Sequence, residues 1–156
     1  MMYFSLIDRI VALQPGERIM AEKVVSPREP YFHDHFPGFP VMPGVLMLEA
    51  MYQTSAWLLL QSKDFACGVA RLRQARNVKY GSFVKPGDVL TITAHVEKQD
   101  DTTTNLRAKG TVREQPAVSA CLLLEHIRSP RDSRKAASSQ PELRAVFDRL
   151  YTPTVS

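Results

Sequence analysis

His35 and Glu49 are the two side chains whose types and surroundings are best suited to proton transfer. His35 lies in a proline-rich stretch, and Glu49 lies early in an apolar segment that is typical of a buried helix. Burying a charged carboxylate in apolar surroundings is costly, so we expect Glu49 to be paired, protonated or both. An imidazole and a carboxylic acid can together remove one proton and deliver another near pH 7. The pair therefore indicates general acid–base catalysis.

Gly44 adds a third element, because it stands where the apolar segment begins, directly after Pro43. A glycine at a helix start leaves the backbone N–H groups of the first turn uncovered, and the helix dipole adds partial positive charge there. Such a site can polarise a thioester carbonyl. It can also stabilise the enolate-like charge that forms when an α-proton is removed.

Each of these residues has an ordinary structural explanation as well. A histidine in a loop is most often a hydrogen-bonded structural residue, and a lone buried glutamate is sometimes only a cap or half of an ion pair. His33, two residues before His35, is better explained as a surface residue than as a second catalyst. The same holds for His95 and His126, which fall within predicted strands and are expected to be structural or solvent-facing.

The elements that must position these residues follow from turns and periodicity. Pro15-Gly16 separates two β-rich runs, residues 4–13 and 17–26, which predicts a hairpin. Residues 27–43 are rich in proline and aromatic side chains, which predicts an ordered loop without regular structure. Residues 45–62 contain no glycine or proline and are apolar on nearly every side, which predicts a helix at the centre of the domain.

Further strands are predicted downstream of this helix. Residues 88–97 alternate apolar and polar side chains, the pattern of a half-buried antiparallel strand. The other strand-like runs are residues 67–80, 104–113 and 116–127. We therefore predict a hairpin, a central helix and a meander of strands as one domain over residues 1–128. Residues 129–156 are predicted to be a polar linker followed by a short amphipathic helix that ends near Tyr151.

Composition narrows the class of protein. The chain has 156 residues, is 44% hydrophobic and carries a formal charge of +4. That length suits one packed core, and the excess charge is too scattered for a nucleic-acid platform, although it suits an acidic protein partner. Scattered cations such as Arg71, Arg76 and Lys79 are candidates for that contact, but such charges are more often a solvated face.

Cysteine usage and hydropathy point to a cytoplasmic protein. Cys67 and Cys121 have no metal-type spacing, so we expect two buried, small apolar residues rather than a disulfide or a zinc site. The first residues lack the apolar run of a signal peptide. The longest apolar stretch, residues 45–60, is shorter than the roughly 20 residues that span a bilayer. We expect no membrane anchor.

The residues that surround His35 and Glu49 resemble the signature of a known family. Residues 35–45 read HFPGFPVMPGV and residues 49–53 read EAMYQ. Together they resemble the signature of the short 3-hydroxyacyl-[acyl-carrier-protein] dehydratases of bacterial fatty acid synthesis. The resemblance covers roughly residues 4–127 and includes the stretch KYGSFVKPGDVL at residues 79–90.

The resemblance implies an α+β hot-dog fold, in which a central long helix is wrapped by a curved antiparallel β-sheet. It also implies a homodimer, often assembled as a trimer of dimers, whose active sites each combine the histidine of one subunit with the glutamate of the other. The implied partner is an acyl carrier protein that bears a 3-hydroxyacyl-phosphopantetheine.

The roles implied by the resemblance are specific. His35 would act on the α-carbon proton and Glu49 would protonate the departing β-hydroxyl, which gives a trans-2-enoyl thioester and water. The backbone at Gly44 would hold the thioester carbonyl. The loop and the entrance would be shaped by Phe36, Pro37, Gly38, Val41 and Pro43. No metal or organic cofactor is required, because the thioester supplies the activation.

Some positions depart from the family pattern. Asp34 stands where a glycine is usual; a carboxylate that faces His35 would favour the protonated imidazole, whereas one that points away from it would not. Tyr52 replaces a small residue and, with Trp57, would fill part of an acyl tunnel and favour short chains.

Two other functions stay open at the level of sequence. One is a hot-dog acyl thioesterase, which would activate water with a carboxylate, since a fold does not fix a function. The other is a non-catalytic subunit that binds acyl chains or carrier protein.

Overall fold

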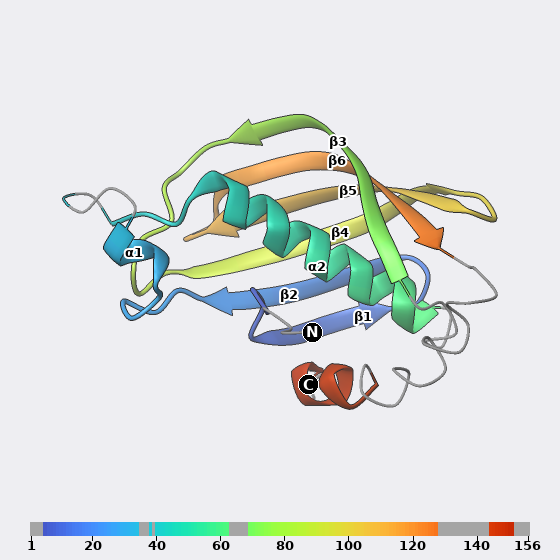
Figure 1. Cartoon of the computed structure of the whole chain (residues 1–156), viewed down its shortest axis with the longest axis horizontal. Coiled ribbons are helices and arrows are strands. Elements are labelled where there is room, and N and C mark those ends of the chain that lie inside the picture. Colours follow the sequence, from blue (N-terminus) through green and yellow to red (C-terminus); the bar gives the residue numbers. More distant parts are fainter. Residues whose placement is uncertain (1–4, 35–37, 39, 63–68, 128–143, 152–156) are drawn as a thin grey trace.

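The computed structural model describes residues 5–34, 38, 40–62, 69–127 and 144–151 (Figure 1). Its named elements are β1 (Arg9–Gln14), β2 (Arg18–Val24), α1 (Tyr31–Asp34), α2 (Gly44–Ser62), β3 (Val69–Tyr80), β4 (Val89–Gln99), β5 (Thr103–Val112) and β6 (Gln115–Ile127). The strands form one six-stranded sheet in the order β1-β2-β4-β5-β6-β3, and every neighbouring pair is antiparallel.

The sheet curves around α2, which lies lengthwise against one of its faces (Figure 1). The helix has buried residues on several sides, among them Met47, Met51, Trp57 and Leu58. This is the central helix and curved antiparallel sheet expected of a hot-dog fold. The predicted α+β class and the predicted helix and strands are therefore confirmed.

One turn of helix appears where the sequence predicts only irregular structure. Residues Tyr31–Asp34 form α1, and the Phe32 N–H donates to the carbonyl of Glu29 at 3.1 Å. Proline is tolerated in the first turn of a helix, and Pro30 directly precedes α1. The Phe32 side chain is 7% exposed and fixes this turn against the core. The expectation of a wholly irregular loop was wrong because prolines flank this turn without falling inside it.

The strands present an inner and an outer face. Along β5, Leu106 and Ala108 are buried on the side of α2, while the alternating Arg107 and Lys109 are exposed. This period of two is the one expected for a strand with one face against the core. Cys121 on β6 belongs to the outer series and is only half buried, so the expectation of a buried apolar cysteine was wrong for this residue. Cys67 lies outside the described residues.

The end of the chain packs onto the domain. Residues 144–150 are helical, where the sequence predicts a short helix, and they lie beside β1 (Figure 1). Phe147 is 6% exposed and its ring lies 6.0 Å from that of Trp57 on α2. Tyr151 pairs with Ile10 through a parallel bridge at the outer edge of β1. The division of the chain at residue 128 falls among residues that the structure does not describe and stays a prediction.

Within the described ranges, no helix is both long enough and apolar enough to cross a membrane.

Removing the Phe147 ring should destabilise the whole domain. Phe147→Ala deletes a buried aromatic side chain and leaves a cavity against Trp57, so we expect the free energy of unfolding to fall by about 3 kcal/mol. Asp148→Ala on the exposed side of the same turn should change it by less than about 0.5 kcal/mol. Urea unfolding followed by Trp57 fluorescence measures both values. Equal stability of the two variants would show that the C-terminal helix is not part of the core.

Candidate active site

The start of α2 opens onto a cleft of about 340 Å³. One wall comes from the segment that leads into α2 and the other from the segment that follows β3. The lining residues are Val41, Met42, Pro43, Gly44, Val45, Met47, Tyr80, Gly81, Ser82 and Phe83. Most of these side chains are apolar, so the cleft can accept an extended acyl or pantetheine chain.

The first wall is fixed by the way α2 begins. The carbonyl of Pro43 accepts hydrogen bonds from the Leu46 and Met47 N–H groups, at 3.0 and 3.2 Å, and so starts the helix. The Gly44 and Val45 N–H groups belong to the first turn, which has no intrahelical acceptors, and Val45 is 68% exposed. The helix dipole reinforces the attraction of these groups for a polarised oxygen. The geometry suits a carbonyl bound at the N-terminus of α2.

The second wall is held by backbone contacts to β6. The Gly81 N–H donates to the carbonyl of Ala117, and the Ser82 N–H donates to that of Pro116, both at 2.8 Å. A Cβ atom at Gly81 would lie 2.4 Å from the Pro116 carbonyl oxygen, so this close approach requires glycine. The Met42 N–H donates to the Val84 carbonyl at 2.8 Å and joins the two walls.

Gly44 and Tyr80 meet across the cleft. A Cβ atom at Gly44 would lie 2.8 Å from the Tyr80 ring, so a larger residue would displace that ring. Tyr80 is 53% exposed and Phe83 is 57% exposed, which is unusual for large aromatic side chains. The mouth of the cleft is therefore an apolar surface that is open in the single chain.

Glu49 is held from within its own helix. Its side chain is half buried, and its Oε1 accepts a hydrogen bond from Gln53 Nε2 at 3.4 Å. The Oε1 of Gln53 accepts a shorter bond, 2.7 Å, from the Leu6 backbone N–H. Because the backbone donor must face the amide oxygen, the amide NH₂ group is turned toward Glu49. Gln53, which is 8% exposed, therefore positions the carboxylate.

Sequence reasoning assigned no role to Gln53. Its spacing of four residues from Glu49 on a helix was the available signal, because residues at i and i+4 are neighbours on a helix surface. The Leu6 contact joins residues that are 47 positions apart, and no local pattern reports it.

Tyr52 lies one turn beyond Glu49 and is fixed to the sheet. Its hydroxyl donates to the Ala70 carbonyl on β3 at 2.6 Å. Burial, and next the neighbouring Glu49 carboxylate, raise the pKa of Tyr52 above its ordinary value. Trp57 contacts Phe147 instead, so the two aromatic residues of α2 lie against different neighbours. Of these two aromatic residues, Tyr52 is the one beside Glu49.

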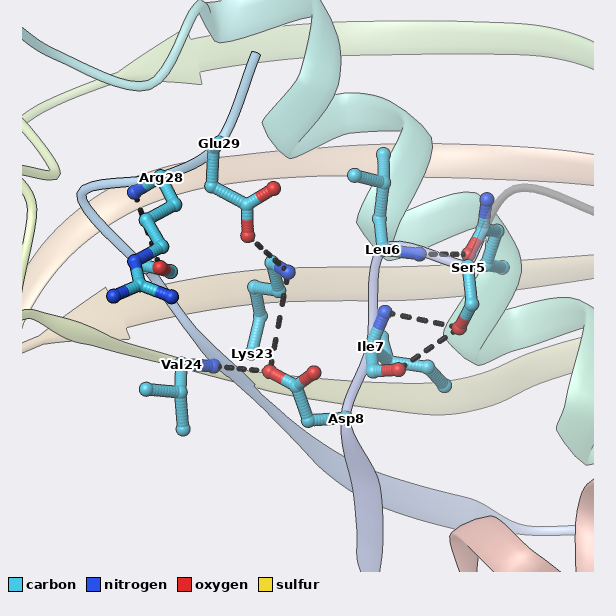
Figure 2. A network of polar contacts seen from close by, with 10 residues as sticks. Ser5, Leu6, Ile7, Asp8, Lys23, Val24, Arg28 and Glu29 are labelled. Carbon is cyan, nitrogen blue, oxygen red and sulfur yellow. Dashed lines mark hydrogen bonds and ion pairs between the residues drawn. The ribbon is translucent and has the colours of Figure 1, made fainter. Parts of the chain in front are cut away.

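A buried ion pair anchors the loop that leads to His35 (Figure 2). Lys23 on β2 is 6% exposed, and its Nζ lies 2.7 Å from Glu29 Oε1 and 4.0 Å from Asp8 Oδ2. Asp8 also accepts a hydrogen bond from the Val24 N–H at 2.5 Å. A buried charge such as that of Lys23 needs a partner, so Glu29 must remain close to it. The ion pair therefore holds the loop that contains Glu29 against β2.

Tyr31 lies in the turn after this ion pair. Burial, followed by the Glu29 and Asp8 carboxylates, raises the pKa of the Tyr31 phenol. Its ring contacts that of Phe32, with centroids 4.7 Å apart. The loop before His35 is therefore fixed by both charge and packing.

The structure locates part of the predicted site. Pro43 and Gly44 line the cleft with Val41, which is 5% exposed, and Gly38 is exposed at the end of the preceding loop. Glu49 follows in the second turn of α2 and is not among the residues that line the cleft. The remaining predicted residues, His35, Phe36 and Pro37, lie outside the described residues, as do the side chains of His33 and Asp34.

Sequence comparisons place this arrangement in a family. Residues 1–121 match the family described as the FabA-like domain. The 3-hydroxyacyl-[acyl-carrier-protein] dehydratase FabZ of Chloroflexus aggregans is 42% identical over 120 residues, which are 77% of this chain and 83% of that protein. The FabZ dehydratase of Oenococcus oeni is also 42% identical, over 76% of this chain and 85% of that protein. The chain belongs to this dehydratase family.

Solved structures agree on the fold. The dehydratase heterocomplex ApeI:P from Xenorhabdus doucetiae contains a chain that superposes with a TM-score of 0.65 at 18% identity, over 80% of this chain and 84% of that one. The smu.793 protein of Streptococcus mutans, bound to acetyl CoA, gives 0.63 at 19% identity, over 81% and 93%. At such low identity these likenesses concern the fold alone.

The helix at residues 144–150 lies beyond the part of the chain that matches the family. The contacts of Phe147 with Trp57 and of Tyr151 with Ile10 thus join residues outside the matched range to residues within it.

The buried ion pair should contribute more to stability than an exposed one. Lys23→Met leaves Glu29, whose side chain is 16% exposed, without its cation, so we expect the free energy of unfolding to fall by about 1.5–3 kcal/mol. Arg9→Met breaks the exposed pair with Glu22, whose atoms lie 2.5 Å apart, and should cost less than about 1 kcal/mol. The double variant Lys23→Met/Glu29→Leu should recover most of the loss. Urea unfolding tests all three, and equal losses at positions 23 and 9 would refute the anchoring role.

Proposed function

We propose that the chain dehydrates 3-hydroxyacyl thioesters carried on acyl carrier protein to trans-2-enoyl thioesters, in fatty acid or related acyl-chain biosynthesis. The observation that carries this proposal is the 42% identity to a FabZ dehydratase over 120 residues, and the family match over residues 1–121 includes the segment from His35 to Gln53. The apolar cleft at the start of α2 supports it, because the thioester arm needs an apolar channel that ends at hydrogen-bond donors.

The proposed mechanism uses three groups. The His35 imidazole removes the α-proton, and the electron pair of the broken C–H bond forms the new C=C bond. Glu49 gives its proton to the β-hydroxyl, whose C–O bond breaks to release water. The N–H groups at Gly44 bind the thioester carbonyl oxygen while negative charge develops on it.

The surrounding residues act on these groups indirectly. Gln53 holds the Glu49 carboxylate through the contact described above, and is therefore a positioning residue. Val41 and Pro43 form the wall beside the carbonyl site, and we assign Phe36 and Gly38 to the entrance of the cleft. The Lys23–Glu29 pair fixes the loop from which His35 follows.

We also propose that two copies of the chain share their active sites. Among the described strands, β3 pairs with β6 alone, so one long edge is open, whereas the Tyr151 bridge covers part of the β1 edge. A long open edge readily pairs with another chain. On α2, the side chains of Val45, Glu49 and Tyr52 recur at helical spacing and are not fully buried by the sheet. A second copy placed along β3 would cover that stripe.

The acidic carrier protein is the proposed partner, and the net charge of +4 favours its approach. The proposed location is the cytoplasm, where such a carrier would supply the substrate.

Catalysis should depend on both proposed groups and on their separation between subunits. His35→Ala and Glu49→Gln should each lower kcat at least about 10³-fold with an unchanged far-ultraviolet CD spectrum, because each removes one proton-transfer step. Exchanging subunits between the two variants should restore about a quarter of the original activity. Half of the dimers are then mixed, and each mixed dimer keeps one intact site.

The assay for this prediction follows enoyl absorbance while free thiol is monitored in parallel. Asp101→Asn, which removes an exposed carboxylate at the β4–β5 turn, serves as the control and should retain full activity. If subunit exchange restores no activity, both groups of each active site come from one subunit. Release of free thiol without enoyl product would show that the chain is a thioesterase and not a dehydratase. Binding of the acyl thioester without either product would indicate a non-catalytic binding subunit.

Tyr52 should limit the length of the acyl chain. Tyr52→Ala empties the space beside Glu49, so kcat/KM for a 3-hydroxyoctanoyl thioester relative to a 3-hydroxybutyryl thioester should rise about tenfold. Tyr52→Phe keeps the ring and loses only the bond to Ala70, and it should leave the ratio nearly unchanged. An equal ratio in all three proteins would show that the chain does not pass this residue.

A further inference from the structure

A second hollow, of about 510 Å³, lies on the face of the sheet away from α2. It is lined by Asn77, Lys79, Arg107, Ser119, Ala120 and Cys121, which belong to β3, β5 and β6. None of these residues contributes to the apolar cleft at the start of α2. The hollow is therefore separate from the proposed site of dehydration.

Strand register places cations on both sides of this hollow. Ser119 on the central strand β6 pairs with Lys79 on β3 and with Lys109 on β5. The next outward-facing residue, Cys121, pairs with Arg76 on β3 and with Arg107 on β5. Since adjacent strands lie about 4.8 Å apart, the flanking cations stand roughly 10 Å apart across a floor of small side chains.

A β-bulge borders the hollow on β3. The register of β3 against β6 shifts between Arg76 and Lys79, and Asn77 within the bulge has a φ of +53°. Asparagine is among the few residues that tolerate this left-handed conformation. The extra residue bends β3 locally, and the Asn77 side chain becomes part of the lining.

The charges around the hollow are only partly neutralised. Arg107 Nε lies 3.0 Å from Glu97 Oε1, an exposed pair that orients the guanidinium without burying it. Lys79, Lys109 and Arg76 are exposed, and the structure gives none of them an ion pair within the described residues. The flanks of the hollow thus carry four cations, and among them Arg107 alone forms an ion pair within the described residues, with Glu97.

We propose that this hollow binds a small phosphorylated anion, of the size of a diphosphate ester. An arginine fork and a lysine are the side chains that bind phosphate oxygens best, and the Ser119 hydroxyl and the Asn77 amide add neutral donors. The described lining contains no aromatic or large aliphatic side chain, so it favours a ligand with little apolar surface. The concave floor of small residues suits a compact ligand better than the flat surface of a protein.

The test is a calorimetric titration of the full chain with inorganic pyrophosphate at about 0.15 M ionic strength, where diffuse attraction is screened. The expected result is saturable binding of one pyrophosphate per chain. Lys79→Gln and Arg107→Gln should each weaken it about tenfold, because each removes a charge-assisted hydrogen bond. Lys98→Gln removes the same charge from an exposed position on β4 and should change the affinity less than about twofold.

A second variant tests the shape of the site without altering its charge. Ser119→Phe fills the floor between Lys79 and Lys109 and should abolish binding, while thermal unfolding reports whether the fold is retained. Turnover of a 3-hydroxybutyryl thioester of N-acetylcysteamine should stay unchanged in all four variants. That result separates this proposal from the proposed dehydration.

Three outcomes would overturn the proposal. Pyrophosphate could fail to bind the unaltered chain, or Lys98→Gln could weaken binding as much as Lys79→Gln, which would mean attraction by net charge alone. The third is that Lys79→Gln and Arg107→Gln leave pyrophosphate binding intact and instead raise KM for a carrier-protein substrate. The cations would then form a protein-docking surface.

Discussion

A helix that is apolar on nearly every side has to be enclosed, and in this chain a single sheet encloses it. Helix α2 packs most closely against β2, β3, β4, β5 and β6, and two of its buried polar residues keep hydrogen bonds there. The Thr54 hydroxyl donates to the Ala50 carbonyl at 2.9 Å, and Gln53 receives the Leu6 N–H. The curvature of the antiparallel sheet and the position of the β1–β2 hairpin beside β4 serve to cover this one helix.

Enclosure also determines where chemistry can occur. This buried helix has two ends and one stripe that the sheet covers only in part, and the candidate groups are found there. Gly44 stands at the open N-terminus, while Glu49 and Tyr52 lie on the stripe. Glu49 can remain beside an apolar core because Gln53 supplies a hydrogen-bond donor that is itself fixed by backbone. The site is thus built at the boundary of the core.

Local sequence patterns predicted the helix and the strands, whereas the packing between them depends on long-range contacts. Helix α2 begins within one residue of its predicted start, because Pro43 and Gly44 mark a helix start and no breaker follows before residue 62. The hairpin turn at Pro15-Gly16 was equally visible, with Gly16 at a φ of +75°. The packing of Phe147 on Trp57 depends on residues far apart in the chain, which periodicity does not report. Residues 35–37 lie outside the described residues, so the histidine half of the site still rests on sequence.

The bulge in β3 shows how one residue can determine which surface a side chain serves. Lys79 and Tyr80 are adjacent, yet Lys79 lines the outer hollow and Tyr80 lines the apolar cleft on the side of α2. Successive side chains on a strand point to opposite faces, so a shift of one residue exchanges their faces. The extra residue between Arg76 and Lys79 is what sets this assignment. Without it, the tyrosine that packs against Gly44 would face solvent, and a lysine would stand at the entrance of an apolar cleft. The bulge therefore determines which side chains of β3 lie on each face of the sheet. Its position matters to the candidate site as much as the residues that line the cleft.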